Sequence, residues 1–234
     1  MIIIIIIIIN HDFIFCKLFL YKLIQNNIIS VERGFMRILC FGDSNTYGFI
    51  PNNFKRYDEN TRWTGLLKKL TNYNVTEAGC NGRTCGFDNN GSKETGYLAI
   101  KNYDTKSYDL IILSIGINDL QTQFQATEND IENGLKKLLS NIENDNILIL
   151  IPTEIHENIL NSWFNSLFNK KSIELSKKLP YIYERVAKEN NCNYIMLKNL
   201  IKITSCDGLH YTENEHKVVG EYLAKYIGDK YSDK

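Results

Sequence analysis

The sequence predicts an α/β fold, a three-layer α/β/α sandwich built around a five-stranded parallel sheet. From residue 36 onward, short apolar runs alternate with segments of helical periodicity, which is typical of consecutive β-α-β units. The run Leu110–Leu113 is continuously apolar, as expected for a strand that is buried on both faces of a sheet. Because β-α-β crossovers are right-handed, the helices are expected to cover both faces.

The expected strands are short apolar runs bounded by turn residues. They cover residues 37–41, 75–78, 109–114, 147–151 and 193–197. Pro152 ends the fourth strand, because proline cannot donate to the hydrogen-bond ladder of a sheet.

The expected helices place leucine, isoleucine or valine at helical spacing on one face. They cover residues 63–70, 127–140, 175–190 and 212–227. Pro180 is expected near the first turn of the third helix or at a kink. Thr212 and Glu215 have the spacing of a capping box at the start of the last helix.

Composition excludes some classes of function. Lysine and arginine number 27, and so do aspartate and glutamate, so the chain has no basic excess and no nucleic-acid partner is expected. The six cysteines form no Cys-x-x-Cys pair, which indicates free thiols in a reducing compartment and a cytoplasmic protein.

Residues 1–35 form a separate segment, which opens with Met1 followed by eight isoleucines. It lacks the basic start and small-residue cleavage site of a signal peptide, and Asn10, Asp12 and Lys17 interrupt it too early for a membrane span. We favour the interpretation that the segment is a non-native or disordered extension and that the domain covers residues 36–234. A membrane anchor and an added structural element are the alternatives, and no membrane partner is expected unless the segment is real.

The first strand ends in Gly42-Asp43-Ser44, so the fold would deliver a serine to the carboxyl edge of the sheet, where ligands bind in such folds. A serine becomes a nucleophile only when a nearby base removes its proton. Taken alone, Gly-Asp-Ser is a common sequence, and a helix N-cap explains this serine better than catalysis does.

The base is expected from the other end of the chain, at Asp207-Gly-Leu-His210. Only His210 among the four histidines has an aspartate three residues earlier, with a glycine between them. That spacing allows Asp207 to hold the imidazole in one tautomer. A loop histidine beside a helix cap remains the alternative for His210 in isolation.

Two further turns follow the second and third strands, at Gly79–Gly82 and Gly116–Asp119. The N–H of Gly82 and the side-chain amide of Asn118 are candidate donors for the oxyanion that forms during acyl transfer. Each turn alone is ordinary turn chemistry, but four such sites, each near a strand end, favour a shared active site.

The four blocks Gly42-Asp-Ser44, Gly82, Gly116-Ile-Asn-Asp119 and Asp207-Gly-Leu-His210 resemble those of the SGNH, or GDSL-type, hydrolase superfamily. Further segments resemble its arylesterase and acyltransferase branch. They are Asn45–Gly48, Arg62–Gly65, Glu77–Thr84 and Asp207–Thr212. The resemblance covers essentially all of residues 36–227.

The resemblance implies a flavodoxin-like fold and a role for each matching residue. Ser44 is the expected nucleophile, His210 the general base and then acid, and Asp207 the residue that orients His210. The N–H groups of Ser44 and Gly82 and the side chain of Asn118 are expected to form the oxyanion hole. Asp43 is expected to support the turn without chemistry. No metal or organic cofactor is expected.

The segment 152–171 departs from that branch, in a region where related esterases vary most and which helps to wall the acyl pocket. Trp163, Phe164 and Phe168 are candidates for a small apolar pocket, although packing on the sheet explains them as well. Trp63 also resembles a position near the site, with a core tryptophan as the alternative.

Together these features predict a cytoplasmic serine esterase, a carboxylic ester hydrolase that acts on small esters through an acyl-enzyme and that has potential acyltransferase activity. A carbohydrate O-deacetylase, a lysophospholipase and a thioesterase are alternatives with the same fold. A non-catalytic, phosphate-binding flavodoxin-like module is an alternative from another class. The expected partner is a small ester, and self-association as a homo-oligomer stays open.

Overall fold

The computed structural model describes residues 36–231, so the interpretation of residues 1–35 lies outside the described part of the chain. Its sheet has five parallel strands, which are β1 (Arg37–Gly42), β2 (Asn74–Gly79), β3 (Leu110–Ser114), β4 (Ile147–Ile151) and β5 (Asn193–Met196). Their order in the sheet is β2-β1-β3-β4-β5. The chain passes from β1 to β2 on one side and returns to β3 on the other, so a crevice is expected at the carboxyl ends of β1 and β3.

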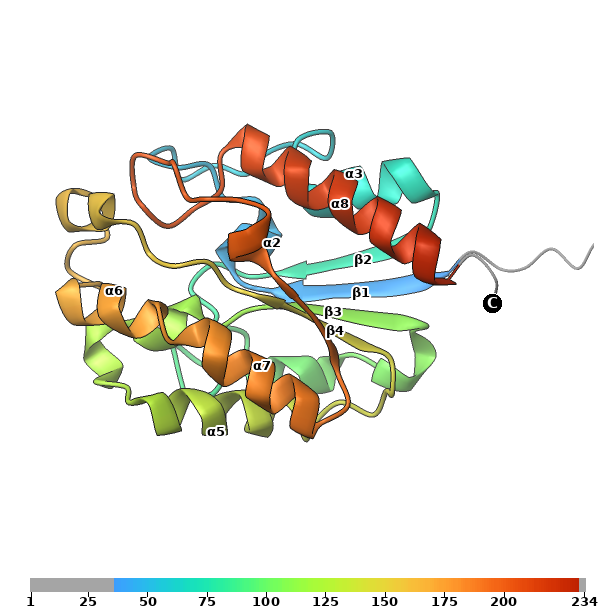
Figure 1. Cartoon of the computed structure of the whole chain (residues 1–234), viewed down its shortest axis with the longest axis horizontal. Coiled ribbons are helices and arrows are strands. Elements are labelled where there is room, and N and C mark those ends of the chain that lie inside the picture. Colours follow the sequence, from blue (N-terminus) through green and yellow to red (C-terminus); the bar gives the residue numbers. More distant parts are fainter. Residues whose placement is uncertain (1–35, 232–234) are drawn as a thin grey trace, which may run out of the picture. The chain divides into compact units, whose positions relative to one another are not determined.

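Helices cover both faces of this sheet (Figure 1). One face carries α3 (Trp63–Thr71) and α8 (Glu213–Tyr231). The other carries α5 (Glu128–Leu139), α6 (Lys170–Ser176) and α7 (Leu179–Glu189). The predicted three-layer α/β/α sandwich is therefore confirmed.

Shorter elements lie in the connections. Two short α-helices are α2 (Ser44–Tyr47) and α4 (Gly96–Ala99). The 3₁₀ turns within residues 36–231 are Ile100–Asn102, Thr105–Ser107, Ile117–Leu120, Thr122–Phe124, Glu157–Asn161 and Leu197–Asn199.

Strand alternation divides the core into two layers, because successive side chains of a strand point to opposite faces. In β1, Leu39 and Phe41 belong to the layer beneath α5 and α7, whereas Ile38 and Cys40 belong to the layer beneath α3 and α8. All four side chains are fully buried. The continuous apolar runs of β3 and β4 follow from this burial on both faces.

The helix predicted over residues 175–190 corresponds to α7, and Pro180 lies in its first turn as expected, but the predicted start is wrong because residues 175 and 176 belong to the separate helix α6. Asn169 is the N-cap of α6, because its side chain accepts a hydrogen bond from the Ser172 N–H at 3.1 Å. This cap begins a helix several residues before the predicted start at residue 175. Pro180 lies in the first turn of α7 and has no N–H to continue the helix from Ser176. The chain therefore ends one helix and starts another before the proline.

The start of α8 is held by Glu215, whose carboxylate accepts a hydrogen bond from the Thr212 N–H at 2.6 Å. Its other oxygen accepts from the N–H and the hydroxyl of Thr204. Glu215 thus links the first turn of α8 to the segment that leads into the Asp207–His210 turn.

Free thiols are confirmed for the cysteines of the described region, which are Cys40, Cys80, Cys85, Cys192 and Cys206. In the same region, residues 36–231, the structure has no helix of the length and apolar character that crossing a membrane requires.

Candidate active site

Ser44 lies at the turn that leaves β1, as the first residue of α2. Asp43 caps this helix, because its Oδ1 accepts a hydrogen bond from the Asn45 N–H at 3.0 Å. Burial raises the pKa of the Asp43 carboxyl to about 7, and the Arg83 charge opposes part of that shift. Asp43 thus supports the turn, and the Ser44 N–H is left at a helix position that has no acceptor within the helix.

The structure brings Ser44, His210 and Asp207 into one hydrogen-bonded chain. The Nε2 atom of His210 lies 3.0 Å from Ser44 Oγ, and its Nδ1 atom lies 2.8 Å from Asp207 Oδ2. Ser44 and His210 are separated by 166 residues in the sequence, and all three side chains are buried. This is the arrangement in which a histidine can take the proton of a serine hydroxyl while a carboxylate holds its ring.

Asp207 is oriented by more than the histidine. Its Oδ1 atom accepts three hydrogen bonds of 3.0 Å each, from the Ser205 hydroxyl and from the N–H groups of Leu209 and His210. Burial raises the pKa of the Asp207 carboxyl, but the hydrogen bonds and the interaction with His210 outweigh burial and hold it below its usual range. A carboxylate held in this way favours the His210 tautomer with its proton on Nδ1, which leaves Nε2 free to accept.

The two other candidate donors come from the turns after β2 and β3. Gly82 has a φ of 73°, a left-handed conformation that glycine adopts without strain. Asn118 lies in the 3₁₀ turn after β3, where its Nδ2 donates to the Arg83 carbonyl at 3.1 Å and its Oδ1 accepts from Gln121. Because an amide has two N–H groups, one remains for a substrate oxygen.

Gly116 shapes the turn that carries Asn118. Its φ is 127°, and an added Cβ would lie 1.8 Å from the Tyr183 hydroxyl oxygen. That hydroxyl donates to the Ile115 carbonyl at 3.1 Å. The position therefore requires glycine for both its backbone conformation and the close approach of α7.

Asp119 connects the two turns. Its carboxylate accepts hydrogen bonds from the N–H groups of Cys85 and Gly86, at 2.5 and 2.8 Å, across the gap between the turns. Burial raises the pKa of Asp119 to about 6, while these backbone hydrogen bonds oppose the shift. Together with the bond from Asn118 to Arg83, this contact holds the Gly82 turn next to the Asn118 turn.

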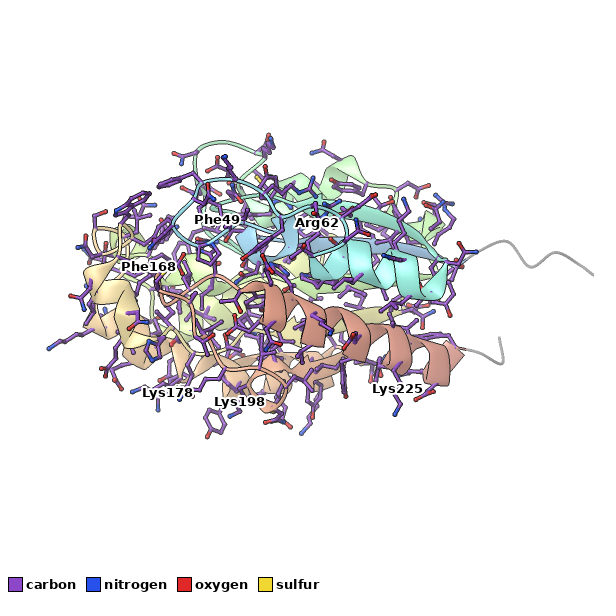
Figure 2. All side chains as sticks on the ribbon, turned by 90° about the horizontal axis from the view of Figure 1, so that it is seen from above. Phe49, Arg62, Phe168, Lys178, Lys198 and Lys225 are labelled. Atoms are coloured by element: carbon purple, nitrogen blue, oxygen red, sulfur yellow. The ribbon has the colours of Figure 1, made fainter. Side chains whose placement is uncertain are left out.

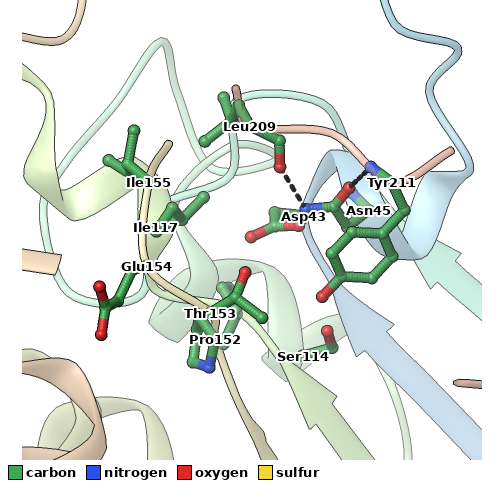
Figure 3. Close-up of a pocket in the computed structure, with 11 residues that line it drawn as sticks. Asp43, Asn45, Ser114, Ile117, Pro152, Thr153, Glu154, Ile155, Leu209 and Tyr211 are labelled. Atoms are coloured by element: carbon green, nitrogen blue, oxygen red, sulfur yellow. Dashed lines mark hydrogen bonds between the residues drawn. The ribbon is translucent and has the colours of Figure 1, made fainter. Parts of the chain in front are cut away.

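Asn45 ties the serine to the histidine, a role that the sequence analysis did not assign. Its Nδ2 donates to the Leu209 carbonyl at 3.3 Å, and its Oδ1 accepts from the Tyr211 N–H at 2.9 Å (Figure 3). These partners flank His210 on both sides. The only sequence signal for this role is that Asn45 directly follows Ser44 in a segment typical of the arylesterase branch.

Comparison with known families decides where this chain belongs. The model of the GDSL-like lipase/acylhydrolase family matches residues 38–223. The chain belongs to this family. The resemblance inferred from the four sequence blocks is confirmed, and so is membership in a family of ester-cleaving hydrolases.

Solved structures show the same fold. Est24, a carbohydrate acetylesterase from Sinorhizobium meliloti, is 24% identical with a TM-score of 0.73, over 84% of this chain and 100% of its own. The M. smegmatis aryl esterase is 24% identical with a TM-score of 0.72, over 83% and 99%. A lipase/acylhydrolase from Enterococcus faecalis is 18% identical with a TM-score of 0.64, over 83% and 96%. The comparison with curated proteins finds no match to the chain.

In this GDSL-like protein, two of the segments typical of the arylesterase branch meet through an ion pair. Arg62 donates two hydrogen bonds to the Glu77 carboxylate, and the Thr64 hydroxyl donates a third at 2.7 Å. Burial raises the pKa of Glu77, but these partners and Arg56 outweigh burial and lower it. The pair fixes the start of α3 against β2.

Aromatic side chains surround His210. The ring centroids of Phe49 and Phe164 lie 4.3 and 5.2 Å from that of His210. Figure 2 shows Phe49 in the half of the molecule away from Lys225, which is the half towards which the strands point in Figure 1. Trp163 is largely exposed and Phe164 is half-buried, so both remain candidates for contact with a substrate. Phe168, by contrast, packs in the core.

Trp63 has no exposed surface, so the expectation that it contacts the substrate is wrong. Its side chain is fully buried beneath α8, and its indole N–H donates to the Asn45 carbonyl at 3.1 Å. The large indole fills the gap between α3 and the sheet. Trp63 therefore supports the Ser44 turn through its hydrogen bond to Asn45, and it has no exposed surface for a ligand.

A cavity of about 10 Å³ is lined by residues on both sides of Ser44 in the sequence (Figure 3). Asp43, Asn45, Ser114 and Tyr211 contribute to its lining. This volume is close to that of one water-sized sphere, so the cavity is too small to hold an ester.

His216, on α8, is fully buried, and its Nδ1 atom accepts a hydrogen bond from the Trp63 N–H at 3.3 Å. Among the described residues its Nε2 atom has no hydrogen-bond partner, and the rings of Tyr57 and Tyr211 face it edge-on. Burial lowers the pKa of His216 to about 3, with His210 and Arg62 contributing in the same direction. The folded protein therefore holds this imidazole neutral.

We expect this histidine to make the protein less stable in mild acid. Below the ordinary histidine pKa of about 6.5, His216 binds a proton in the unfolded chain but not in the native protein. The free energy of unfolding therefore falls as the pH drops from about 6.5 towards 3. Between pH 7 and pH 5 this linkage amounts to about 2 kcal/mol. Urea unfolding of wild type and His216→Asn at both pH values should show the smaller loss in the variant.

The difference between the two proteins isolates His216, because Asp43 and Asp119 titrate in both and act in the opposite direction. His156→Asn serves as the control, since His156 also accepts a backbone N–H through Nδ1, at 3.2 Å, but is only half-buried. Equal acid sensitivity in wild type and His216→Asn would contradict the expectation.

Proposed function

We propose that this protein is a serine esterase that hydrolyses small carboxylic esters through an acyl-enzyme on Ser44. The observation that carries the proposal is the chain of hydrogen bonds from Asp207 through His210 to Ser44, with distances of 2.8 and 3.0 Å. A second support is the position of Asn118, whose amide keeps one N–H for a substrate oxygen. A phosphate-binding module would need neither of these features.

In the first half of the reaction, His210 Nε2 takes the Ser44 proton as Oγ attacks the ester carbonyl carbon. The negative charge then develops on the former carbonyl oxygen. The N–H groups of Ser44 and Gly82 and the free N–H of Asn118 donate to it, and one such donor contributes roughly 2.7–4 kcal/mol of transition-state stabilisation. His210 passes its proton to the alkoxide oxygen as the carbon–oxygen bond breaks, and the alcohol leaves.

In the second half, His210 takes a proton from water, which attacks the acyl-enzyme at the same carbonyl carbon. The same donors stabilise the second oxyanion, and His210 returns the proton to Ser44 as the acid leaves. An alcohol that replaces this water would receive the acyl group, so acyltransferase activity is part of the proposal. Asp207 stabilises the charged imidazole in both halves and keeps its own charge.

A carbohydrate O-deacetylase is the second candidate for the same site. Two observations favour it: the structural likeness to the carbohydrate acetylesterase Est24, and exposed aromatic rings near His210, which can pack against a sugar ring. The chemistry at Ser44 would be identical, and only the alcohol part of the substrate would differ. No observation favours a lysophospholipase or a thioesterase over these two.

The proposal is tested with p-nitrophenyl esters from acetate to octanoate and with a p-nitrophenyl alkylphosphonate. We expect hydrolysis that declines with acyl length. The phosphonate should release one p-nitrophenol per protein as Ser44 Oγ forms a bond to phosphorus, because the tetrahedral adduct resembles the proposed intermediate. Peptide mass mapping should find the adduct on Ser44. Failure to hydrolyse any ester together with no adduct at Ser44 would sink the proposal.

A further inference from the structure

Two large aromatic side chains close to the triad are exposed to solvent. Phe54 is 62% exposed and Trp163 is 63% exposed, and their rings stack with centroids 4.7 Å apart and planes inclined by 12°. The two residues come from different loops, one after α2 and one after β4. Exposed apolar surface of this kind, gathered from separate segments, is typical of a binding site.

This pair continues inward to His210. Phe49 and Phe164 lie between the exposed pair and the imidazole, with Phe49 5.8 Å from Phe54 and Phe164 6.5 Å from Phe54 between ring centroids. Phe49 and Phe164 in turn contact the His210 ring. We call the four residues Phe49, Phe54, Trp163 and Phe164 the aromatic shelf.

The backbone holds Phe54 in place at a cost. Its φ of 54° is in the left-handed region, which bulky side chains rarely adopt. The loop around it is closed by hydrogen bonds from the Ile50 N–H to the Lys55 carbonyl and from the Tyr57 N–H to the Gly48 carbonyl, at 2.9 and 2.7 Å. Conformations of this kind concentrate at ligand-binding sites, where the surrounding structure maintains them.

The proposed chemistry decides which part of an ester meets the shelf. The oxyanion must point towards Gly82 and Asn118, whereas the leaving oxygen must lie within hydrogen-bond distance of His210 Nε2 to receive its proton. The substituent on that oxygen is the alcohol part of the ester. Because the shelf begins at the His210 ring, it lies on the alcohol side of the substrate.

We propose that the aromatic shelf binds a ring carried by the alcohol part of the ester and makes Phe54 and Trp163 specificity-determining residues. The proposal rests on the esterase function above and deepens it, and it assigns the segment around Trp163 to the alcohol where the sequence suggested the acyl group. A ring can stack on flat aromatic faces over its whole area, whereas a short alkyl group covers only part of them.

The test uses two isomers, benzyl acetate and methyl phenylacetate, which carry the same phenyl ring on the alcohol side and on the acyl side. In Trp163→Ala and in Phe54→Ala we expect KM for benzyl acetate to rise about threefold to tenfold with kcat unchanged, on the scale of one lost aromatic pair. The kinetics of methyl phenylacetate should not change. Tyr181→Ala is the control, because Tyr181 is 66% exposed but its ring lies against Lys198.

A binding measurement separates this proposal from the proposed function. Trp63 is buried and Trp163 is exposed, so a ligand on the shelf should change the emission of Trp163. In Ser44→Ala, benzyl acetate should change the fluorescence at lower concentrations than methyl phenylacetate, and adding Phe54→Ala should remove that preference. This readout needs no turnover, so it tests the shelf even if the wild type hydrolyses neither ester.

Three results would overturn the proposal. One is an equal loss for both isomers in the shelf variants, and another is a larger loss for methyl phenylacetate, which would place the shelf on the acyl side. The third is a Tyr181→Ala variant that behaves like the shelf variants.

Discussion

Replacing Ser44 with alanine is expected to lower kcat for ester hydrolysis by about 10⁶-fold, the scale seen when a serine hydrolase loses its nucleophile. Without Oγ no acyl-enzyme can form, whereas Gly82, Asn118 and the aromatic shelf remain to bind the ester. KM should therefore change little. Steady-state kinetics with p-nitrophenyl acetate, on protein free of wild-type contamination, measure both values.

The matched control is Ser114→Ala, which removes a buried hydroxyl from the end of β3, the neighbouring strand. That hydroxyl takes no part in the proposed mechanism, so the variant should retain near-normal activity. The thermal midpoint of Ser44→Ala should stay within a few degrees of the wild type, since the change removes one hydrogen bond, between Oγ and His210 Nε2, and no apolar contact. Equal activity in Ser44→Ala and wild type would remove Ser44 as the nucleophile.

Replacing Asp207 with asparagine is expected to lower kcat by about 10⁴-fold with the fold intact, as in other serine hydrolases. The three donors on Oδ1 hold one side of the residue, so the new amide oxygen must stay there to accept from Ser205, Leu209 and His210. The NH₂ group then faces His210 Nδ1 and donates to it. This reverses the His210 tautomer and puts the ring proton on Nε2. A protonated Nε2 cannot accept the Ser44 proton.

Kinetics of Asp207→Asn beside Asp229→Asn separate this effect from a change of net charge, because Asp229 is an exposed aspartate near the end of α8. Urea unfolding checks that the variant remains folded. A kcat within about tenfold of the wild type would show that Asp207 does not set the tautomer.

Periodicity in the sequence was enough to predict the layers of the fold. Each predicted strand overlaps an observed one, and the fourth coincides with β4 (Ile147–Ile151). This succeeded because the strands of a parallel sheet are buried on both faces and so appear as continuous apolar runs. The third predicted helix starts too early and α6 is missed, because the cap at Asn169 that begins α6 is a local feature that apolar spacing does not detect.

The candidate triad and oxyanion donors could also be found in the sequence, because each follows a strand or opens a helix and the fold brings such positions to one edge. Asn45 and Asp119 were visible in the same motifs, but their roles were not. Asn45 donates one hydrogen bond to the Leu209 carbonyl and accepts another from the Tyr211 N–H. These bonds join segments more than 160 residues apart, and no spacing in the sequence encodes them. The tertiary structure alone shows that these side chains hold the serine, the histidine and the two turns together.

By itself, then, the sequence determined the fold class, the family and the identity of the candidate catalytic residues, since backbone periodicity and short motifs are local properties. Only the tertiary structure decided which aromatic residues face solvent. Trp63 and Trp163 each follow a polar residue and lie near apolar ones in the sequence, yet the first is buried beneath α8 and the second is exposed beside Phe54. Burial depends on what packs against a side chain from distant segments, so substrate contacts could not be assigned before the loops around His210 were seen in space.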